Sequence, residues 1–261
     1  MGDDSAALRV DPTGAALTIR FQRPPANAFD VPMAEALRRH LELAAGDPGV
    51  RCVCLTGSGR FFSAGQDVST IAQASPDVVR RALDEIYHPL ILLLRMMPKP
   101  ILAAVNGPAA GMGLGLALAA DMRLAARSAR FVFGFSALGL TSDCGVSLLL
   151  AGWVGAGRAL AMALSEEPLD AEQARHAGLA AAVVEDEDLA AEAEAWSQRL
   201  AAGPTLAYGL TKQAINEAVF SDLDGKLAGE AVRQTLAAGT ADAGEGVRAF
   251  LEKRRPVFRG A

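Results

Sequence analysis

The amino-acid sequence predicts an α/β fold, and three observations support this prediction. Short apolar stretches typical of buried strands alternate along the chain with longer stretches whose apolar residues recur at helical spacing. Glycine-rich segments stand where a strand-like stretch passes into a helix-like one. The last third of the 261 residues consists of alanine-rich helical patterns. Strands and helices that alternate in this way are joined by right-handed crossovers.

The predicted elements follow these patterns along the chain. A hairpin is expected over residues 7–22 with its turn at 11–14, and a helix is expected to begin at Pro32. The next predicted elements are a strand at 50–55, a helix at 76–96, a strand at 101–105, a glycine-rich turn at 106–113 with an apolar helix to residue 120, and strands at 122–125 and 131–133. From residue 148 onward the pattern is mostly helical, with one strand at 180–184 and helix breaks at Gly203-Pro204 and Gly225.

The helical last part is expected to belong to the same structural domain as the rest of the chain. No stretch with the composition of a linker precedes it. We therefore predict a core over residues 1–200 and a C-terminal helical region over residues 201–261 within one domain.

Composition and charge argue against several classes of function. The chain carries 30 acidic and 25 basic side chains and shows no basic patch, which argues against a nucleic-acid partner. The long uncharged stretch over 100–120 contains glycine and proline that would break a membrane-spanning helix. Three cysteines, an odd number, fit a reducing cytoplasm, and neither they nor the three histidines have the spacing of a metal site. We therefore expect a cytoplasmic protein without a membrane segment or a bound metal.

Three glycine-containing segments, 59–68, 104–115 and 138–145, are the candidates for chemistry. The second begins a helix after a strand, where free N–H groups favour negative charge and glycine lets a ligand approach the backbone. Such a turn can bind a phosphate or a developing oxyanion. The phosphate motifs are absent, because no Lys-Ser/Thr pair follows and the glycines at 111, 113 and 115 lack the dinucleotide spacing. By spacing alone, a tight turn that binds nothing explains the segment equally well.

Taken in order, these segments resemble the enoyl-CoA hydratase/isomerase (crotonase) family. Arg23-Pro24, Asn27-Ala28 and the ending at 250–258 extend the resemblance over essentially the whole chain. It implies the crotonase fold, a spiral of ββα units followed by helices that mediate trimerisation. It also implies an acyl-CoA thioester as substrate, with coenzyme A as part of that substrate and no separate cofactor. The assembly it implies is a homotrimer or a dimer of trimers.

The same resemblance assigns the site residues. It places two oxyanion donors at the backbone N–H groups of Gln66 and Met112, whose side chains are then expected to vary freely. Donors of this kind hold the thioester oxygen as it becomes enolate-like, and each is worth about 2.7–4 kcal/mol in known cases. The groove for coenzyme A and the thioester is expected at Ala28, Ala64, Val68 and Gly111. Two further acids are expected to be structural and to cap turns, namely Asp67 and Asp121.

The sequence departs from the hydratases of this family at their two acids. A hydratase uses one carboxylate to deprotonate water and another to protonate carbon. Gly115 and Phe135 stand at the two corresponding positions. Asp143 remains, at a position where isomerases and a dehalogenase of the family carry an aspartate. One carboxylate suffices to move a double bond, and apolar neighbours can raise its pKa. Alternatively, Asp143 caps the helix that follows it.

The other candidate groups have structural interpretations. Cys144 has no histidine partner visible in the sequence and is expected to fill space. A solvated helical face is the expected location of Asp84, Glu85 and His88. An apolar acyl pocket or plain core packing would each explain Phe135, Leu138, Leu140 and Trp153. Three functions follow, in this order: an enoyl-CoA isomerase that uses Asp143, a non-catalytic acyl-CoA binder, and a hydratase with an atypical acid or base.

Overall fold

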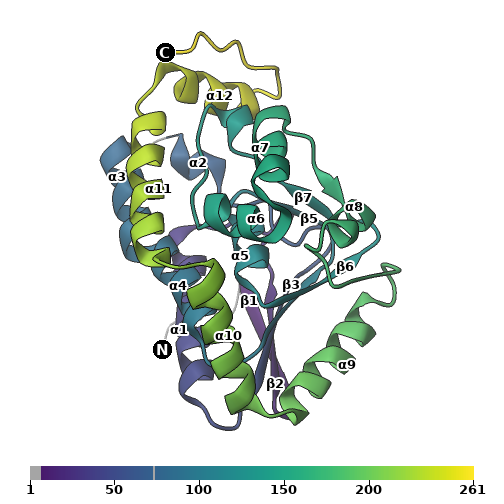
Figure 1. The fold of residues 1–261 in the computed structure, drawn as a ribbon. Helices are drawn as coiled ribbons and strands as arrows, with labels where there is room; N and C mark the ends of the chain where they lie inside the picture. The colour runs from purple at the N-terminus through teal and green to yellow at the C-terminus, as the bar shows by residue number, and fades with distance from the viewer. Residues whose placement is uncertain (1–6, 73) are drawn as a thin grey trace.

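The structure, a computed structural model, describes residues 7–72 and 74–261, and its main sheet has six strands in the order β1-β2-β3-β4-β6-β9 (Figure 1). These strands are β1 (Leu8–Thr13), β2 (Ala16–Phe21), β3 (Cys52–Gly57), β4 (Ile101–Val105), β6 (Met122–Ala126) and β9 (Ala182–Val184). The first two are antiparallel and the others pair in parallel. A smaller sheet contains β5 (Pro108–Ala110), β7 (Arg130–Val132) and β8 (Leu169–Asp170).

The helices lie on both faces of the main sheet. In the described residues they are α1 (Val31–Gly46), α2 (Val68–Ile71), α3 (Pro76–Ala82), α4 (His88–Met96), α5 (Met112–Ala119), α6 (Val146–Val154), α7 (Ala156–Ser165), α8 (Ala171–His176), α9 (Leu189–Ala202), α10 (Thr205–Val219), α11 (Leu223–Ala238) and α12 (Ala241–Leu251). Strand β3 shows how the two faces divide. Val53 and Leu55 join the large core that contains α1, α4 and α5, whereas Cys54 packs with α9.

The chain forms a spiral of ββα units, as predicted. Strand β4 of the main sheet leads into β5 of the small sheet and then into α5, and β6 leads in the same way into β7 and α6. One turn earlier, β3 is followed by a segment that pairs only through the isolated bridges Ser63–Ala109 and Phe29–Gln66, and then by α2. Each unit therefore ends where a short strand passes into a helix, and these junctions lie side by side.

Several predicted elements differ in detail. The hairpin turns after Thr13 rather than at 11–14, and the predicted helix at 76–96 contains a π-helical turn over Leu83–Tyr87. Gly225 does not break a helix but lies inside α11, because the break between α10 and α11 comes earlier, where Asp222 has a left-handed φ of 56°. A glycine inside a helix costs about 1 kcal/mol, which the packing of α11 on the core outweighs. The short strands β5 and β8 were not predicted.

The division of the chain at residue 200 remains a prediction. Residue 201 lies in the last turn of α9, and the next helix begins at Thr205. Among the residues that the structure describes, no helix is both long enough and apolar enough to cross a membrane.

Candidate functional site

The segment that carries Gln66 lies beside residues 26–30. Phe29 N–H donates to the Gly65 carbonyl at 2.7 Å, and Asp67 N–H donates to the Phe29 carbonyl at 2.8 Å. These two bonds form a parallel bridge between Phe29 and Gln66. In such a bridge the N–H and C=O of Gln66 itself point away from Phe29. The amide of Gln66 is therefore directed out of this pair of segments.

Gly65 brings this segment against the beginning of α5. Its φ is +91°, and a Cβ atom there would lie 2.6 Å from the Ala110 carbonyl oxygen and 3.2 Å from the Met112 nitrogen. Only glycine fits this conformation and this close approach. The amide that follows Gly65 and the amide of Met112 therefore belong to directly adjacent segments.

The Met112 amide is free because of its place in the helix. Met112 is the first residue of α5, so its N–H has no carbonyl one turn earlier to bind. Within residues 7–72 and 74–261, neither this amide nor that of Gln66 donates a hydrogen bond to another residue. The structure thus brings together the two predicted oxyanion donors, with both N–H groups available. Two such donors can hold an oxygen that gains negative charge.

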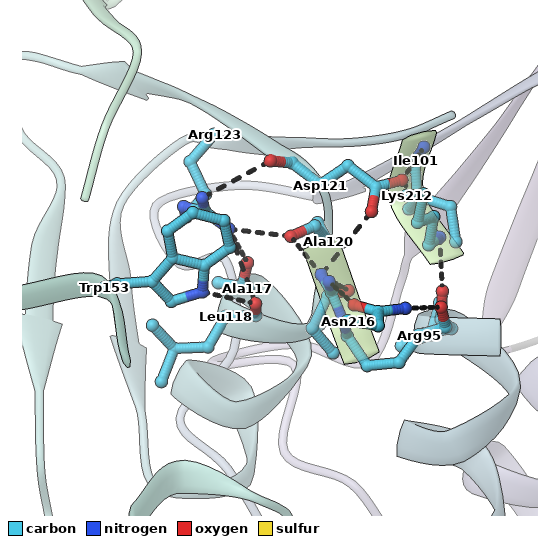
Figure 2. Close-up of polar contacts among 12 residues, drawn as sticks. Arg95, Ile101, Ala117, Leu118, Ala120, Asp121, Arg123, Trp153, Lys212 and Asn216 are labelled. Carbon is cyan, nitrogen blue, oxygen red and sulfur yellow. Dashed lines mark hydrogen bonds and ion pairs between the residues drawn. The ribbon is translucent and has the colours of Figure 1, made fainter. Parts of the chain in front are cut away.

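The opposite end of α5 is held by buried cations (Figure 2). Arg123 donates to the carbonyls of Ala117, Leu118 and Ala120 at 3.3, 3.4 and 2.7 Å. Arg95 and the Trp153 indole complete the contacts, the indole at 3.1 Å from the Leu118 carbonyl. Cations at a helix C-terminus complement its dipole, and here they also satisfy carbonyls that are buried. The helix is therefore fixed at the end away from Met112.

Asp67 and Asp121, which were expected to cap turns, both make structural contacts, but only Asp67 is a cap. Asp67 caps α2 by accepting from Ser69 N–H at 3.1 Å, and it pairs with Arg23 at 2.9 Å. Asp121 is not a simple turn cap. It accepts from Ile101 N–H at 2.8 Å and from the buried Lys212 ammonium at 3.0 Å (Figure 2).

Asp143 is a buried carboxylate, 4% exposed. Its Oδ2 accepts a hydrogen bond from Gln234 Nε2 on α11 at 3.0 Å. Burial raises the pKa of Asp143 to about 6; a hydrogen bond with Cys144 and that from Gln234 oppose the rise, while the charge of Glu230 adds to it. A carboxyl group with such a pKa can exchange protons near neutral pH.

The alternative that Asp143 caps the following helix is wrong. Helix α6 begins at Val146, and its N-cap residue is Gly145, which has no side chain that could cap the helix. Glu230 fills this role from α11, because its carboxylate accepts from the N–H groups of Gly145 and Ser147 at 2.7 and 2.9 Å. The Asp143 side chain is thus left free of helix capping.

The turn that carries Asp143 fills the space beside Gly115. A Cβ atom at Gly115 would lie 2.7 Å from the Cys144 carbonyl oxygen and 3.1 Å from the Cys144 Cβ. Position 115, one turn after Met112 on α5, therefore has no room for the glutamate that a hydratase would place there. Cys144 is buried, and burial raises the pKa of its thiol well above the ordinary value, as suits the predicted space-filling role.

The residues predicted to line the coenzyme A groove lie in segments that meet at Gly65. Ala64 is exposed and donates its N–H to the Ala26 carbonyl at 2.9 Å, and Val68 opens α2 three residues after Gly65. The other two predicted residues flank the same place, namely Ala28 in the segment paired with Gln66 and Gly111 directly before Met112.

Of the apolar residues considered for an acyl pocket, Phe135 lies beside Gly111, and Trp153 packs in the core. The Phe135 ring lies 3.8 Å from the position of a Cβ at Gly111, and Leu140 borders a cavity of about 500 Å³ between α3 and α12. Leu138 packs against α12 at Gly246. Trp153 stacks instead under the Arg123 guanidinium at 4.1 Å, so core packing explains this residue.

Three residues of the site neighbourhood were missed in the sequence, namely Tyr87, Glu230 and Gln234. Glu230 and Gln234 lie on one face of α11 between buried apolar residues. Two polar residues within an apolar stripe of a helix were the only sequence pattern that could have indicated them. Their partners are 85 and 91 residues away, which no local pattern reveals.

One predicted surface residue is in fact internal. His88, expected on a solvated face, is 4% exposed, and burial lowers its pKa to about 4. Its helix neighbours Asp84 and Glu85 are exposed as expected. No group of three or more histidine, cysteine, aspartate or glutamate side chains that could hold a metal ion occurs in the described part of the chain.

The fold is a spiral of ββα units in which two available amides, one of them at the start of helix α5, lie in adjacent segments. The chain matches the Enoyl-CoA hydratase/isomerase family over residues 12–261. The protein belongs to this family and has the crotonase fold.

Relatives within the family carry different activities in their names. The chain is 44% identical over 249 residues to the 1,2-epoxyphenylacetyl-CoA isomerase of Escherichia coli, which covers 94% of this chain and 95% of the relative. It is 40% identical to a probable enoyl-CoA hydratase of Rhodobacter capsulatus, over 97% of this chain and 98% of the relative. A crystal structure of an enoyl-CoA hydratase from Mycobacterium avium subsp. paratuberculosis superposes with a TM-score of 0.88 at 35% identity, covering 97% and 99% of the two chains.

Proposed function

We propose that this protein is an enoyl-CoA double-bond isomerase in which Asp143 is the acid and base. The thioester oxygen is held by the N–H groups of Gln66 and Met112. One observation carries the proposal. Asp143 is a buried carboxylate with a raised pKa, whereas position 115, where a hydratase has one of its two acids, has no room for an acidic side chain. Isomerisation needs one proton-transfer group, whereas hydration needs two.

The proposed reaction is a proton transfer through an enolate. The ionised Asp143 takes a proton from an acyl carbon adjacent to the double bond, and the electron pair moves through the conjugated system onto the thioester oxygen. The amides of Gln66 and Met112 hydrogen-bond this oxygen while it is charged. Asp143, now protonated, returns the proton to another carbon, and the double bond ends in its new position with no net gain or loss of atoms.

The substrate is proposed to be an acyl-CoA whose coenzyme A part follows Ala28, Ala64, Val68 and Gly111. Its acyl group would lie against Phe135 and Leu140. The name of the Escherichia coli relative, 1,2-epoxyphenylacetyl-CoA isomerase, supports isomerisation and an acyl group that carries a ring. No cofactor beyond the substrate is invoked. We keep a homotrimer or a dimer of trimers, and a cytoplasmic location, as expectations from the family resemblance and the cysteine content.

Two alternatives make different use of the same site. A non-catalytic binder would hold acyl-CoA at the two amides without turnover. A hydratase would need a second acid, and Glu230 is the nearest buried carboxylate. The hydrogen bonds of Glu230 to the Gly145 and Ser147 amides commit this group to holding α6, which argues against that role.

The test is to incubate the protein with a 3-enoyl-CoA and with a 2-enoyl-CoA in deuterated water. Isomerase activity moves the double bond without adding water, and any deuterium in the acyl chain reports how far the transferred proton exchanges with solvent. Hydratase activity adds water and removes the conjugated absorbance. Asp143→Asn should abolish the shift, while Asp84→Asn, which changes an exposed carboxylate, should leave it intact. Hydration without a double-bond shift, or binding without either reaction, would contradict the proposal.

A further inference from the structure

The long helical stretch from α3 to α4 contains a π-helical turn over Leu83–Tyr87. His88 N–H donates to the Leu83 carbonyl, five residues earlier instead of four. Pro89, two residues after Tyr87, has no N–H and its ring would clash with the carbonyl four residues before it, which accounts for a break in regular helix here. One extra residue in a turn rotates the side chains that follow by about 100°, and π-turns occur often at functional sites.

The π-turn ends at Tyr87, which reaches the candidate site. The side chain is 1% exposed, and its hydroxyl oxygen accepts a hydrogen bond from Gln66 Nε2 at 3.3 Å. Burial raises the pKa of the Tyr87 phenol. The hydroxyl therefore lies against the side chain of Gln66, and it stays protonated at neutral pH.

The side chain of Gln66 is thus engaged, although a backbone donor does not need it. The segment of Gln66 is held on its backbone side by the two hydrogen bonds with Phe29. The residue before it is Gly65, which has no side chain to restrain the peptide. The Tyr87 hydroxyl supplies a contact from the other direction. Together the two contacts define the rotation of the Gly65–Gln66 peptide and hence the direction of its N–H.

We propose that Tyr87 is a positioning residue: its hydroxyl holds the Gln66 side chain and thereby aims the Gln66 amide at the thioester oxygen. This inference rests on the proposed oxyanion role of that amide. A tyrosine that only fills the core would also bury its ring and find a partner for its hydroxyl. The two roles differ in that positioning changes the polarisation of a bound thioester, whereas packing changes stability alone.

The first measurement needs no turnover. The protein is mixed with hexanoyl-CoA labelled with 13C at the thioester carbonyl, and the infrared frequency of the bound carbonyl is recorded. Wild-type protein should lower this frequency, because two N–H donors polarise the bond. Tyr87→Phe and Gln66→Ala, which remove the same hydrogen bond from its two ends, should each lose roughly half of the shift, as expected for a weakened donor out of two. Tyr208→Phe, which alters the other tyrosine of the chain, on α10, is the matched control and should keep the full shift.

The second measurement is a double-mutant cycle on the isomerisation rate. Tyr87→Phe and Gln66→Ala should each lower kcat by about 5- to 20-fold with little change in KM, because a misaimed donor weakens transition-state binding most. In the double variant the losses should not multiply, since both substitutions remove one interaction. Losses that multiply, or an unchanged carbonyl frequency in both single variants, would overturn the positioning role. A wild-type frequency shift without any isomerisation would overturn the proposed reaction alone and leave the role of Tyr87 to be decided by the infrared result.

Discussion

Replacing Asp143 by asparagine should change activity and stability in opposite directions. The carboxylate is buried, and its pKa is raised from the ordinary 3.8 to about 6. Its folded-state pKa is thus above its unfolded value, so the stability associated with this group is present below about pH 4 and is lost as the pH rises through 6. Asparagine has a similar shape, carries no charge, and can still accept the hydrogen bond from Gln234.

The size of the effect follows from the pKa difference. Each pKa unit corresponds to about 1.4 kcal/mol, so the variant should exceed wild type in the free energy of unfolding by about 3 kcal/mol at pH 8 and by about 1.5 kcal/mol at pH 5. Its isomerase kcat should fall by at least about 100-fold, because a general base has been removed. The wild-type rate should rise with pH through about 6 and then level off, as Asp143 ionises.

The assay is urea denaturation of both proteins at the two pH values, at one fixed protein concentration so that any subunit association contributes equally. Turnover of a 3-enoyl-CoA is followed with the same preparations. A gain in stability that grows with pH, together with lost turnover, is the expected result. An Asp143→Asn protein that keeps full activity, or one that is less stable than wild type at pH 8, would refute the reasoning.

Three further substitutions probe the same site. Gly115→Glu should fail to create hydratase activity and should lower the free energy of unfolding by about 1–3 kcal/mol, because its Cβ would lie 2.7 Å from the Cys144 carbonyl oxygen. Hydration assays and urea denaturation test this prediction. A gain of hydratase activity would contradict it. Gln234→Leu should move the midpoint of the pH–rate profile upward, because the amide hydrogen bond lowers the pKa of Asp143; an unchanged midpoint would argue that Asp143 does not govern the rate. Gly65→Ala should lower kcat by about 100-fold or more, since the left-handed backbone and the contact with α5 cannot both persist and one oxyanion donor is displaced; normal kinetics would show that this segment does not carry a donor.

The sequence was sufficient for the features that depend on local backbone. Alternating strand-like and helix-like stretches predicted the α/β order, and the family resemblance implied the spiral of ββα units. The glycine-rich turn at 106–113 was correctly predicted to lead from a strand into a helix. The Met112 amide is free because an amide at a helix start has no carbonyl one turn earlier, whatever its side chain. The Gln66 amide is free for another reason, because it points away from Phe29 in the bridge between these two residues. The missing acids at Gly115 and Phe135 were also readable from the sequence.

Only the tertiary structure decided how side chains distant in sequence come together around these amides. Gln234 binds Asp143 across 91 residues, Tyr87 meets Gln66 across 21 residues after a π-turn, and Glu230 takes the capping role that Asp143 was free to play in the sequence alone. The sequence shows that position 115 lacks a glutamate, and the structure adds that a glutamate would not fit there. The physical reason is that backbone conformation follows from local residue types, whereas burial, the pKa of Asp143 and the partner of each polar group depend on which helices pack over the site.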